Sequence, residues 1–150
     1  MENLVVASVQ KLFIRDLDKL SVELTQYKDE KLIWKLQGEI KNPAGNLCLH
    51  LCGNLQYYIG AVLGNTGYVR NRDSEFALKY ISRENLLNEI AITRKAIVET
   101  LPRLTESQLH LEYPVDVFGY PITTGFFLIH LSTHLGYHLG QINYHRRLVG

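Results

Sequence analysis

The residues best suited to chemistry are four histidines near the end of the sequence: His130, His134, His138 and His145. The first three follow one another at four-residue steps, and Gln141 and His145 continue the series at the next three- and four-residue steps. Residues three and four apart lie on one face of an α-helix, so these positions form a single stripe. Neutral imidazole is a common metal ligand, and the spacing therefore predicts a divalent-metal site on a C-terminal helix.

The competing interpretation is that these histidines pack and hydrogen-bond in the core, as a single buried histidine usually does. Several imidazoles on one apolar stripe would repel one another when protonated, and when neutral they would leave nitrogens that need partners. A divalent cation satisfies several lone pairs at once, which favours metal binding. The spacing alone allows either His130 with His134 or His134 with His138, and a third ligand is expected from another segment.

The third ligand is expected on a second helix over residues 42–63. Its first two residues are an asparagine able to cap a helix and a proline suited to the first helical position. His50 lies in this stretch and is the only histidine among the first hundred residues. Asn54 and Tyr57 follow it four and seven positions later, on the same helix face, and are candidates for contacts around the metal or to a substrate.

Cys48 and Cys52 form a competing pair of soft ligands on the same helix. At about 100° per residue, each lies about 200° from His50, so the thiols and the imidazole do not share one ion. We expect both cysteines to be buried core residues, and their helical spacing is poor for a disulfide. With Ile59 and Val62 they form a second apolar stripe, which predicts an outward packing face and a homodimer.

The remaining helices are predicted from hydrophobic spacing and capping residues. Apolar residues at three- and four-residue intervals predict an amphipathic helix from Glu2 to Tyr27, followed by a short turn over 29–34 and a polar loop over 37–42. A serine at the start of 82–101 is expected to cap a third helix, which ends before a proline.

The segment before the histidine helix has mostly non-helical signals. One further turn is predicted at 105–109, and two prolines and a glycine within 111–122 predict extended chain with a turn, in the form of a small hairpin. Thr123 or Thr124 is expected to cap the last helix. Four amphipathic helices predict an all-α four-helix bundle, in which metal ligands project inward from facing helices.

Two connections, 65–82 and 102–122, are long for a simple up-and-down bundle, so at least one crossover is expected. The first contains Tyr68–Phe76, YVRNRDSEF, with two arginines and two acids. We interpret this stretch as a solvated loop stabilised by local ion pairs, in preference to a lid or an anion clamp over the site.

Length and composition describe one domain over residues 1–150. With 16 basic and 15 acidic side chains the net charge is +1, which gives no electrostatic reason to expect nucleic acid as a partner. The sequence has no apolar run long enough to cross a bilayer and no signal-peptide pattern at its N-terminus. We therefore expect a cytoplasmic protein that binds a small molecule and not a membrane.

Two stretches resemble the DinB/YfiT-like superfamily of bacterial metal-binding four-helix bundles. One is GNLCLHLCGNLQYYIGAVLG with the following YVRNRDSEF, and the other is HLSTHLGYHLGQINYHRRL. The second is the more specific, because HxxxHxGQ on the final helix matches the pattern of that superfamily. The likeness extends over nearly the whole chain, and the first stretch resembles a poorly characterised branch.

The resemblance implies that His138, His134 and His50 bind one divalent ion, such as zinc, nickel or iron. His130 would then lie one turn away as a supporting or pocket residue, and Gln141 would hold a ligand or bound water by hydrogen bonding. The resemblance also implies crossover connections and a homodimer.

Characterised members of that superfamily include thiol-dependent S-transferases and a thiol-dependent isomerase. The resemblance thus implies transfer of a low-molecular-weight thiol to a small electrophile, in detoxification or stress response. The sequence shows no Gly-x-Ser-x-Gly elbow, P-loop or dinucleotide fingerprint. Arg70, Arg72 or Tyr57 are candidates for positioning the substrate. The alternatives are a metal-dependent hydrolase and a non-enzymatic protein whose metal ties two helices together.

Overall fold

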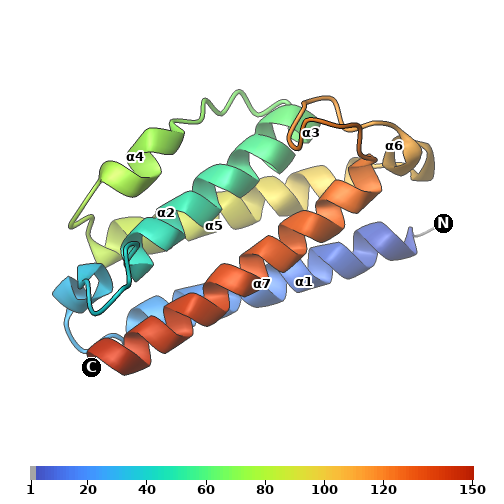
Figure 1. The fold of residues 1–150 in the computed structure, drawn as a ribbon. Coiled ribbons are helices and arrows are strands. Elements are labelled where there is room, and N and C mark those ends of the chain that lie inside the picture. The colour runs from blue at the N-terminus through green and yellow to red at the C-terminus, as the bar shows by residue number, and fades with distance from the viewer. Residues whose placement is uncertain (1–2) are drawn as a thin grey trace.

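The computed structural model describes residues 3–150, where the regular elements are all helical and no strand is formed (Figure 1). The all-α class is therefore confirmed. Long helical segments make up most of the chain: α1 (Leu4–Gln26), α2 (Ala44–Leu55) continued by the π-helical turn η2 (Gln56–Ala61) and α3 (Val62–Gly64), α5 (Arg83–Thr100), and α7 (Thr124–Val149). Shorter elements join them: η1 (Glu30–Trp34), α4 (Arg72–Ala77), η3 (Leu101–Arg103) and α6 (Glu106–His110).

The four long segments pack side by side. Helix α1 contacts α5 and α7, and α2 contacts the same two helices from the other side. Figure 1 shows that α1 and α7 run in one direction and that α2 and α5 run in the other. Because α2 and α5 are parallel, the chain between them must return along the molecule, and α4 lies on this return path. This is the kind of crossover that the length of the 65–82 connection predicts.

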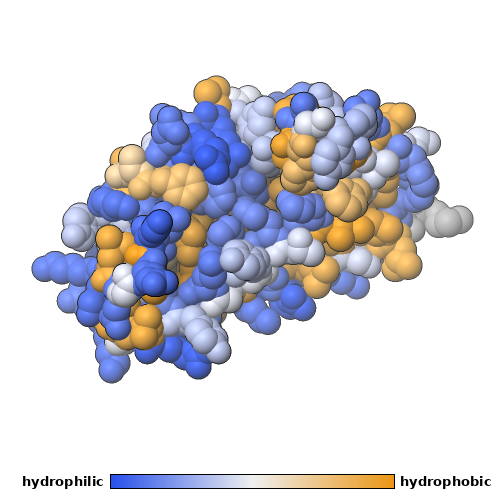
Figure 2. Space-filling model, viewed as in Figure 1, coloured by the Kyte–Doolittle hydropathy of each residue, from blue (hydrophilic) through white to orange (hydrophobic). Residues whose placement is uncertain are grey.

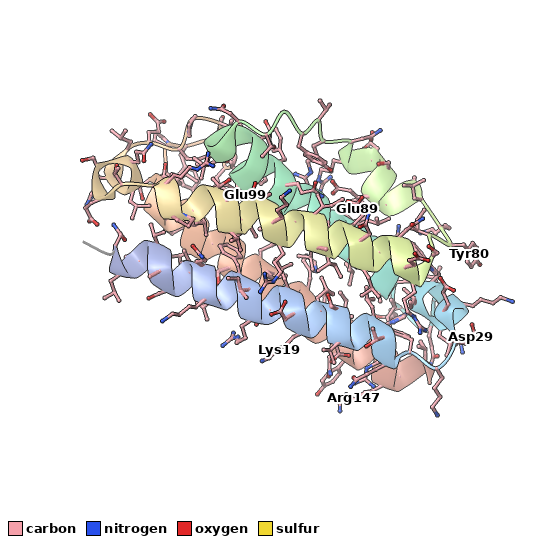
Figure 3. The ribbon with its side chains drawn as sticks, turned by 180° about the vertical axis from the view of Figure 1, so that it is seen from behind. Lys19, Asp29, Tyr80, Glu89, Glu99 and Arg147 are labelled. Atoms are coloured by element: carbon pink, nitrogen blue, oxygen red, sulfur yellow. The ribbon has the colours of Figure 1, made fainter. Side chains whose placement is uncertain are left out.

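The core forms where the apolar stripes of these helices meet. Phe13, Leu17 and Leu20 of α1 are fully buried, as are Leu86 of α5 and Leu128 of α7. Burial of each such side chain stabilises the fold by about 1.5–3 kcal/mol. From behind, α1 and α5 lie side by side, and the labelled Asp29 and Tyr80 mark the end of the molecule where α5 begins (Figure 3).

The second apolar stripe of α2 does not face outward, as the dimer prediction assumed. Cys48, Cys52 and Ile59 are buried within this one chain, on a segment that packs against α5. The prediction that both cysteines are core residues is confirmed, whereas the outward packing face is wrong. The crossover places α5 against the side of α2 that a sequence pattern alone leaves unassigned.

Most helix starts agree with the capping residues of the sequence. Ser82 Oγ accepts a hydrogen bond from the Asn85 N–H, and Thr123 Oγ1 accepts one from the Phe126 N–H, both at 3.1 Å. The predicted turn at 105–109 is α6, capped by Thr105. The expected start of the first helix at Glu2 lies outside the described residues, within which α1 begins at Leu4.

The start of α2 differs from the prediction by one residue. The helix begins at Ala44, Pro43 is its cap residue with extended backbone, and no side chain caps it. The Pro43 carbonyl accepts the first helical hydrogen bond, from Leu47 N–H. Asn42 therefore lies one position too early to cap, because proline at Pro43 itself has the extended ψ that the cap position requires. At the other end Asn65 adopts φ +51°, as expected after Gly64.

The predicted hairpin before α7 is reduced to a single bridge between Glu112 and Thr123. Tyr113 N–H donates to the Ile122 carbonyl at 2.8 Å, but no strand extends from this pair within residues 3–150. Prolines near both sides of the bridge lack the N–H groups that a longer ladder needs. None of the helices described over 3–150 has the length and apolarity to cross a bilayer.

Candidate metal centre

Three of the predicted ligands meet between α2 and α7. His50, His134 and His138 each offer one ring nitrogen, and these three atoms lie within 4.8 Å of one another. His50 Nε2 and His134 Nε2 are 3.3 Å apart. Two nitrogens bound to a tetrahedral ion at about 2.0–2.1 Å would be roughly 3.3–3.4 Å apart, so this pair fits a divalent ion with little adjustment. The three histidines could therefore hold one metal ion.

His50 is fixed by a hydrogen bond on its other nitrogen. Its Nδ1 lies 3.1 Å from Oε1 of Glu75, and both side chains are buried. An ionised carboxylate can only accept a hydrogen bond, so Nδ1–H donates and Nε2 keeps a free lone pair. That lone pair points toward His134, as in the carboxylate–histidine–metal arrangements of metalloproteins.

His138 is held in a corresponding way by Gln141. The distance from His138 Nδ1 to Gln141 Oε1 is 2.7 Å, and the amide oxygen can only accept. Nδ1–H is therefore the donor, which leaves Nε2 of His138 free as a ligand atom. Gln141 was predicted to hydrogen-bond a ligand, and the structure places it in contact with His138.

His134 lacks a partner on the far side of its ring. Its Nδ1 is a buried polar atom with no hydrogen bond among the described residues. Burial, followed by the nearby His138 and His50, lowers the pKa of His134 to about 4. Burial also lowers the pKa of His138, against the opposing effect of its hydrogen bond to Gln141. Both imidazoles are neutral near pH 7, which is the protonation state that metal binding requires.

Glu75 and Arg70 complete the surroundings of His50, a role that the sequence pattern did not predict for either residue. Arg70 Nε lies 2.9 Å from Glu75 Oε2, and Arg70 Nη2 lies 3.0 Å from Oε1. Burial alone would raise the pKa of Glu75, but the hydrogen bonds from His50 and Arg70 outweigh it, and the net pKa is lowered. The buried carboxylate is thus ionised and paired, as a buried charge must be.

Helix α4 brings Glu75 to α2, so the interpretation of Tyr68–Phe76 as a solvated loop is wrong for its second half. Asn46 Nδ2 donates to the carbonyl oxygens of Glu75 and Leu78, at 2.9 and 2.8 Å, and fastens α4 to α2. A Cβ added at Gly53 would collide with the Glu75 carboxylate. This helix-interior glycine, three residues after His50, was the one sequence signal for a close approach.

The other predicted pocket residues are not all gathered at the three histidines. Asn54 is buried, and its Oδ1 has no hydrogen-bond partner among residues 3–150. The Tyr57 ring packs on Tyr58, with centroids 5.0 Å apart, and among the described residues it neither stacks on a histidine nor hydrogen-bonds to one. Its predicted alignment with His50 assumed an uninterrupted α-helix, whereas the π-helical turn η2 changes the angular step from Gln56 onward.

His130 and the two arginines also have definite positions. The His130 ring lies 4.9 Å from Phe118 and 6.5 Å from His134, between centroids, one turn from the three histidines as expected. Arg70 is occupied by Glu75 and is not free to bind a substrate. Arg72 lies over the Phe76 ring at 5.3 Å on an exposed part of α4.

His145, the last member of the stripe, is separate from this site. Its Nε2 lies 2.8 Å from the Lys35 carbonyl, and its Nδ1 lies 2.7 Å from the Tyr27 hydroxyl. Because the carbonyl can only accept, Nε2–H donates to it and Nδ1 accepts from Tyr27 O–H. Both nitrogens are satisfied by the protein, so His145 is a core histidine.

Comparison with known proteins places this arrangement in an uncharacterised family. A search of curated proteins finds no match. The family model described as "Protein of unknown function (DUF1572)" matches residues 3–150, which is nearly the whole chain. The chain therefore belongs to the DUF1572 family of proteins of unknown function.

Proposed function

We propose that this protein is a DinB-like four-helix bundle in which His50, His134 and His138 bind one zinc, nickel or iron ion. The observation that carries the proposal is the pairing of Nδ1 of His50 with Glu75 and of His138 with Gln141. Each pairing leaves Nε2 free, and Nε2 of His50 faces His134. Partners of this kind commonly orient metal-binding histidines.

The reaction that we propose is transfer of a low-molecular-weight thiol to a small electrophile. Three protein ligands leave at least one coordination position open, which is typical of catalytic sites. A divalent ion bound there would supply Lewis acidity and lower the pKa of a bound thiol or water. His134 and His138 are only partly buried, so small molecules can approach their side of the site.

The cysteines of the chain favour an external thiol over a protein nucleophile. Cys48 and Cys52 are both free and almost completely buried. The hydrogen bond with Cys52 and then burial raise the pKa of the Cys48 thiol. A protonated, enclosed thiol is a poor nucleophile, so a thiol-transfer reaction would need a small thiol from solution.

The homodimer remains part of the proposal on the resemblance to DinB proteins alone. The Cys48 and Cys52 stripe, which first suggested a second packing face, is covered by α5 within the chain. Light scattering at micromolar concentration would distinguish a dimer from a monomer of 17.2 kDa.

Two measurements test the proposal together. Elemental analysis of protein purified without an affinity tag should give one divalent ion per chain for wild type and almost none for His134→Ala. The metal-loaded wild type should then transfer at least one of several biological thiols to a model electrophile faster than the metal-free protein. Equal rates with and without metal would contradict the enzymatic part of the proposal and leave a non-enzymatic metal protein.

A further inference from the structure

A groove runs along the outer face of α7 beside the three histidines. One wall is a stripe of α7 side chains at four-, three- and four-residue steps: Tyr137, Gln141, Tyr144 and Leu148. The other wall is the loop over 37–42, and Leu47 of α2 contributes to the floor. From His138, which also lines the groove, to Leu148 is ten residue steps along the helix, which is about 15 Å at 1.5 Å per residue. The groove is therefore long enough to hold an extended chain of several carbon atoms.

The groove begins at the metal centre. His138 is a member of both the groove and the three-histidine cluster. The Gln141 side chain, which is hydrogen-bonded to His138 Nδ1, also lines the groove. A molecule lying in this groove would therefore have one end next to His138 and the other near Leu148.

The lining of the groove is mainly apolar, and much of it is exposed. Tyr137, Tyr144 and Leu148 are 65%, 72% and 54% exposed, which is unusual for large apolar side chains placed on one stripe. Hydrophobic side chains gather between hydrophilic ones at the end of the molecule where α7 meets the 37–42 loop (Figure 2). Apolar side chains exposed in a line favour an apolar ligand.

The charges on the groove offset one another. Glu39 and Lys41 lie two residues apart on the loop wall and have opposite sign. His145, which also reaches the groove, uses both of its nitrogens within the protein. The lining residues thus give no net charge that would select an acidic or basic chain.

We propose that this groove binds the elongated, uncharged aliphatic part of the substrate and directs its reactive end toward the three histidines. The inference rests on the proposed metal-centred function and adds a substrate class to it: electrophiles that carry an alkyl chain. Short polar electrophiles would gain nothing from Tyr144 or Leu148.

The groove is tested first on the metal-free protein with 1-butanol, 1-hexanol and 1-octanol. The NMR signals of the Leu148 methyl groups and the Tyr144 ring report binding. We expect the affinity to rise by about twofold per added methylene, roughly half of the gain from complete burial, because the groove is open on one side. Leu148→Ser should remove most of this dependence on chain length.

The matched control is Ile129→Ser. Ile129 lies on the same helix and is exposed to a similar extent, 49%, but it does not line the groove. It should keep the wild-type dependence on chain length. Equal effects of Leu148→Ser and Ile129→Ser, or no dependence on chain length in wild type, would overturn the proposal. A dimer that Leu148→Ser dissociates would also overturn it, because a second copy would then occupy the groove.

A second probe separates failure of the groove from failure of the metal site. Acetohydroxamate and octanohydroxamate are titrated against zinc-loaded protein, since a hydroxamate group binds zinc and only the longer chain can extend toward Leu148. We expect octanohydroxamate to bind more tightly by at least tenfold. Equal affinities would overturn the groove proposal and leave the metal site intact. If neither hydroxamate binds, while the affinity for the alcohols still rises with chain length, the proposed metal-centred function would be overturned and the groove proposal would stand.

Discussion

Helix α7 contains histidines in two contrasting environments. His145 has a protein partner on each nitrogen, the Tyr27 hydroxyl and the Lys35 carbonyl. His134 lies about three turns earlier on the same helix. Its Nδ1 has no partner among the described residues, and its Nε2 lies 3.3 Å from Nε2 of His50. Spacing on a helix therefore identifies histidines that could act together, but the groups opposite each ring decide which of them can bind a metal.

The largest effect predicted from this comparison is on metal content. His134→Ala should abolish stoichiometric zinc binding, because it removes one of the three imidazoles of the site, whose ring centroid lies 5.1 Å from that of His50 and 4.6 Å from that of His138. His145→Ala should keep nearly all of the zinc, although it loses two hydrogen bonds and is less stable. The zinc content per chain of both variants is measured by elemental analysis after dialysis to remove free zinc. Loss of zinc in both variants to the same extent would mean that the two environments do not differ in the way we describe.

The next effect concerns the carboxylate beside His50. Glu75→Gln should weaken zinc affinity by about 10–100-fold, since partners that orient metal ligands typically contribute this much. Competition with a chromophoric chelator measures the affinity. Glu106→Gln is the matched control, because Glu106 also lies 3.1 Å from a histidine, His110, but at an exposed position. An equal loss in both variants would show that the effect comes from overall charge.

A smaller effect is expected from closing the space that Glu75 occupies. In Gly53→Ala the new Cβ would displace the carboxylate, so zinc affinity should fall in the same direction as in Glu75→Gln. Gly140→Ala is the control, because a Cβ there meets nothing within 4 Å. Zinc titration of both variants should separate them, and unchanged affinity in Gly53→Ala would mean that Glu75 does not orient His50.

The contribution of His145 is expected in the pH dependence of folding. Burial lowers its pKa below 6.5, and the hydrogen bond to the Lys35 carbonyl opposes this only in part. The unfolded state therefore binds the proton more readily, so the stabilisation is complete above pH 6.5 and is lost as the pH falls below it. His134 and His138 titrate in the same direction. Subtracting the unfolding free energy of a His145→Gln variant from that of wild type at each pH isolates the contribution of His145.

Urea unfolding of metal-free protein at pH 7.5 and pH 5.5 provides the measurement. The difference in unfolding free energy between wild type and His145→Gln should shrink on acidification. Glu23 and Arg146, the charged groups that act on the neighbouring Tyr27, are paired with each other at 2.6 Å and are the same in both proteins. A difference that stays constant or grows at pH 5.5 would contradict the assignment of His145 as a neutral core histidine.

The smallest effect is expected at Gln141. Its side chain is exposed, so water can replace it as the partner of His138 in Gln141→Ala, and zinc affinity should fall by less than about tenfold. If Gln141→Ala lost more zinc affinity than Glu75→Gln, Gln141 and not Glu75 would contribute more to orienting the ligands, contrary to our prediction.

The sequence was sufficient for features that depend on local spacing. The all-α class and the caps at Ser82 and Thr123 follow from such spacing and agree with the prediction. The proximity of His50, His134 and His138 was implied by the family resemblance, and it agrees as well. The prediction of an outward packing face was wrong because a stripe of apolar residues does not indicate which helix covers it.

The role of Glu75 as the buried partner of His50 could not be predicted from the neighbouring sequence. Glu75 lies among charged residues in a segment with no amphipathic period, and its burial follows from the crossover that lays α4 over α2. The hydrogen bonds of Asn46, the space at Gly53 and the charge of Arg70 then allow a buried carboxylate. The contacts of Asn46 and Gly53 join segments that are distant in sequence, and periodicity and capping do not describe such contacts; Arg70 lies five residues before Glu75 and becomes its partner only once α4 is in place.

The most direct test of the central claim is anomalous diffraction at the zinc edge from crystals of untagged, zinc-loaded protein. We predict one peak bounded by nitrogen atoms of His50, His134 and His138, at metal–nitrogen distances of about 2.0–2.2 Å. A peak held instead by His130 or by Cys48 and Cys52, or no peak between α2 and α7, would contradict it.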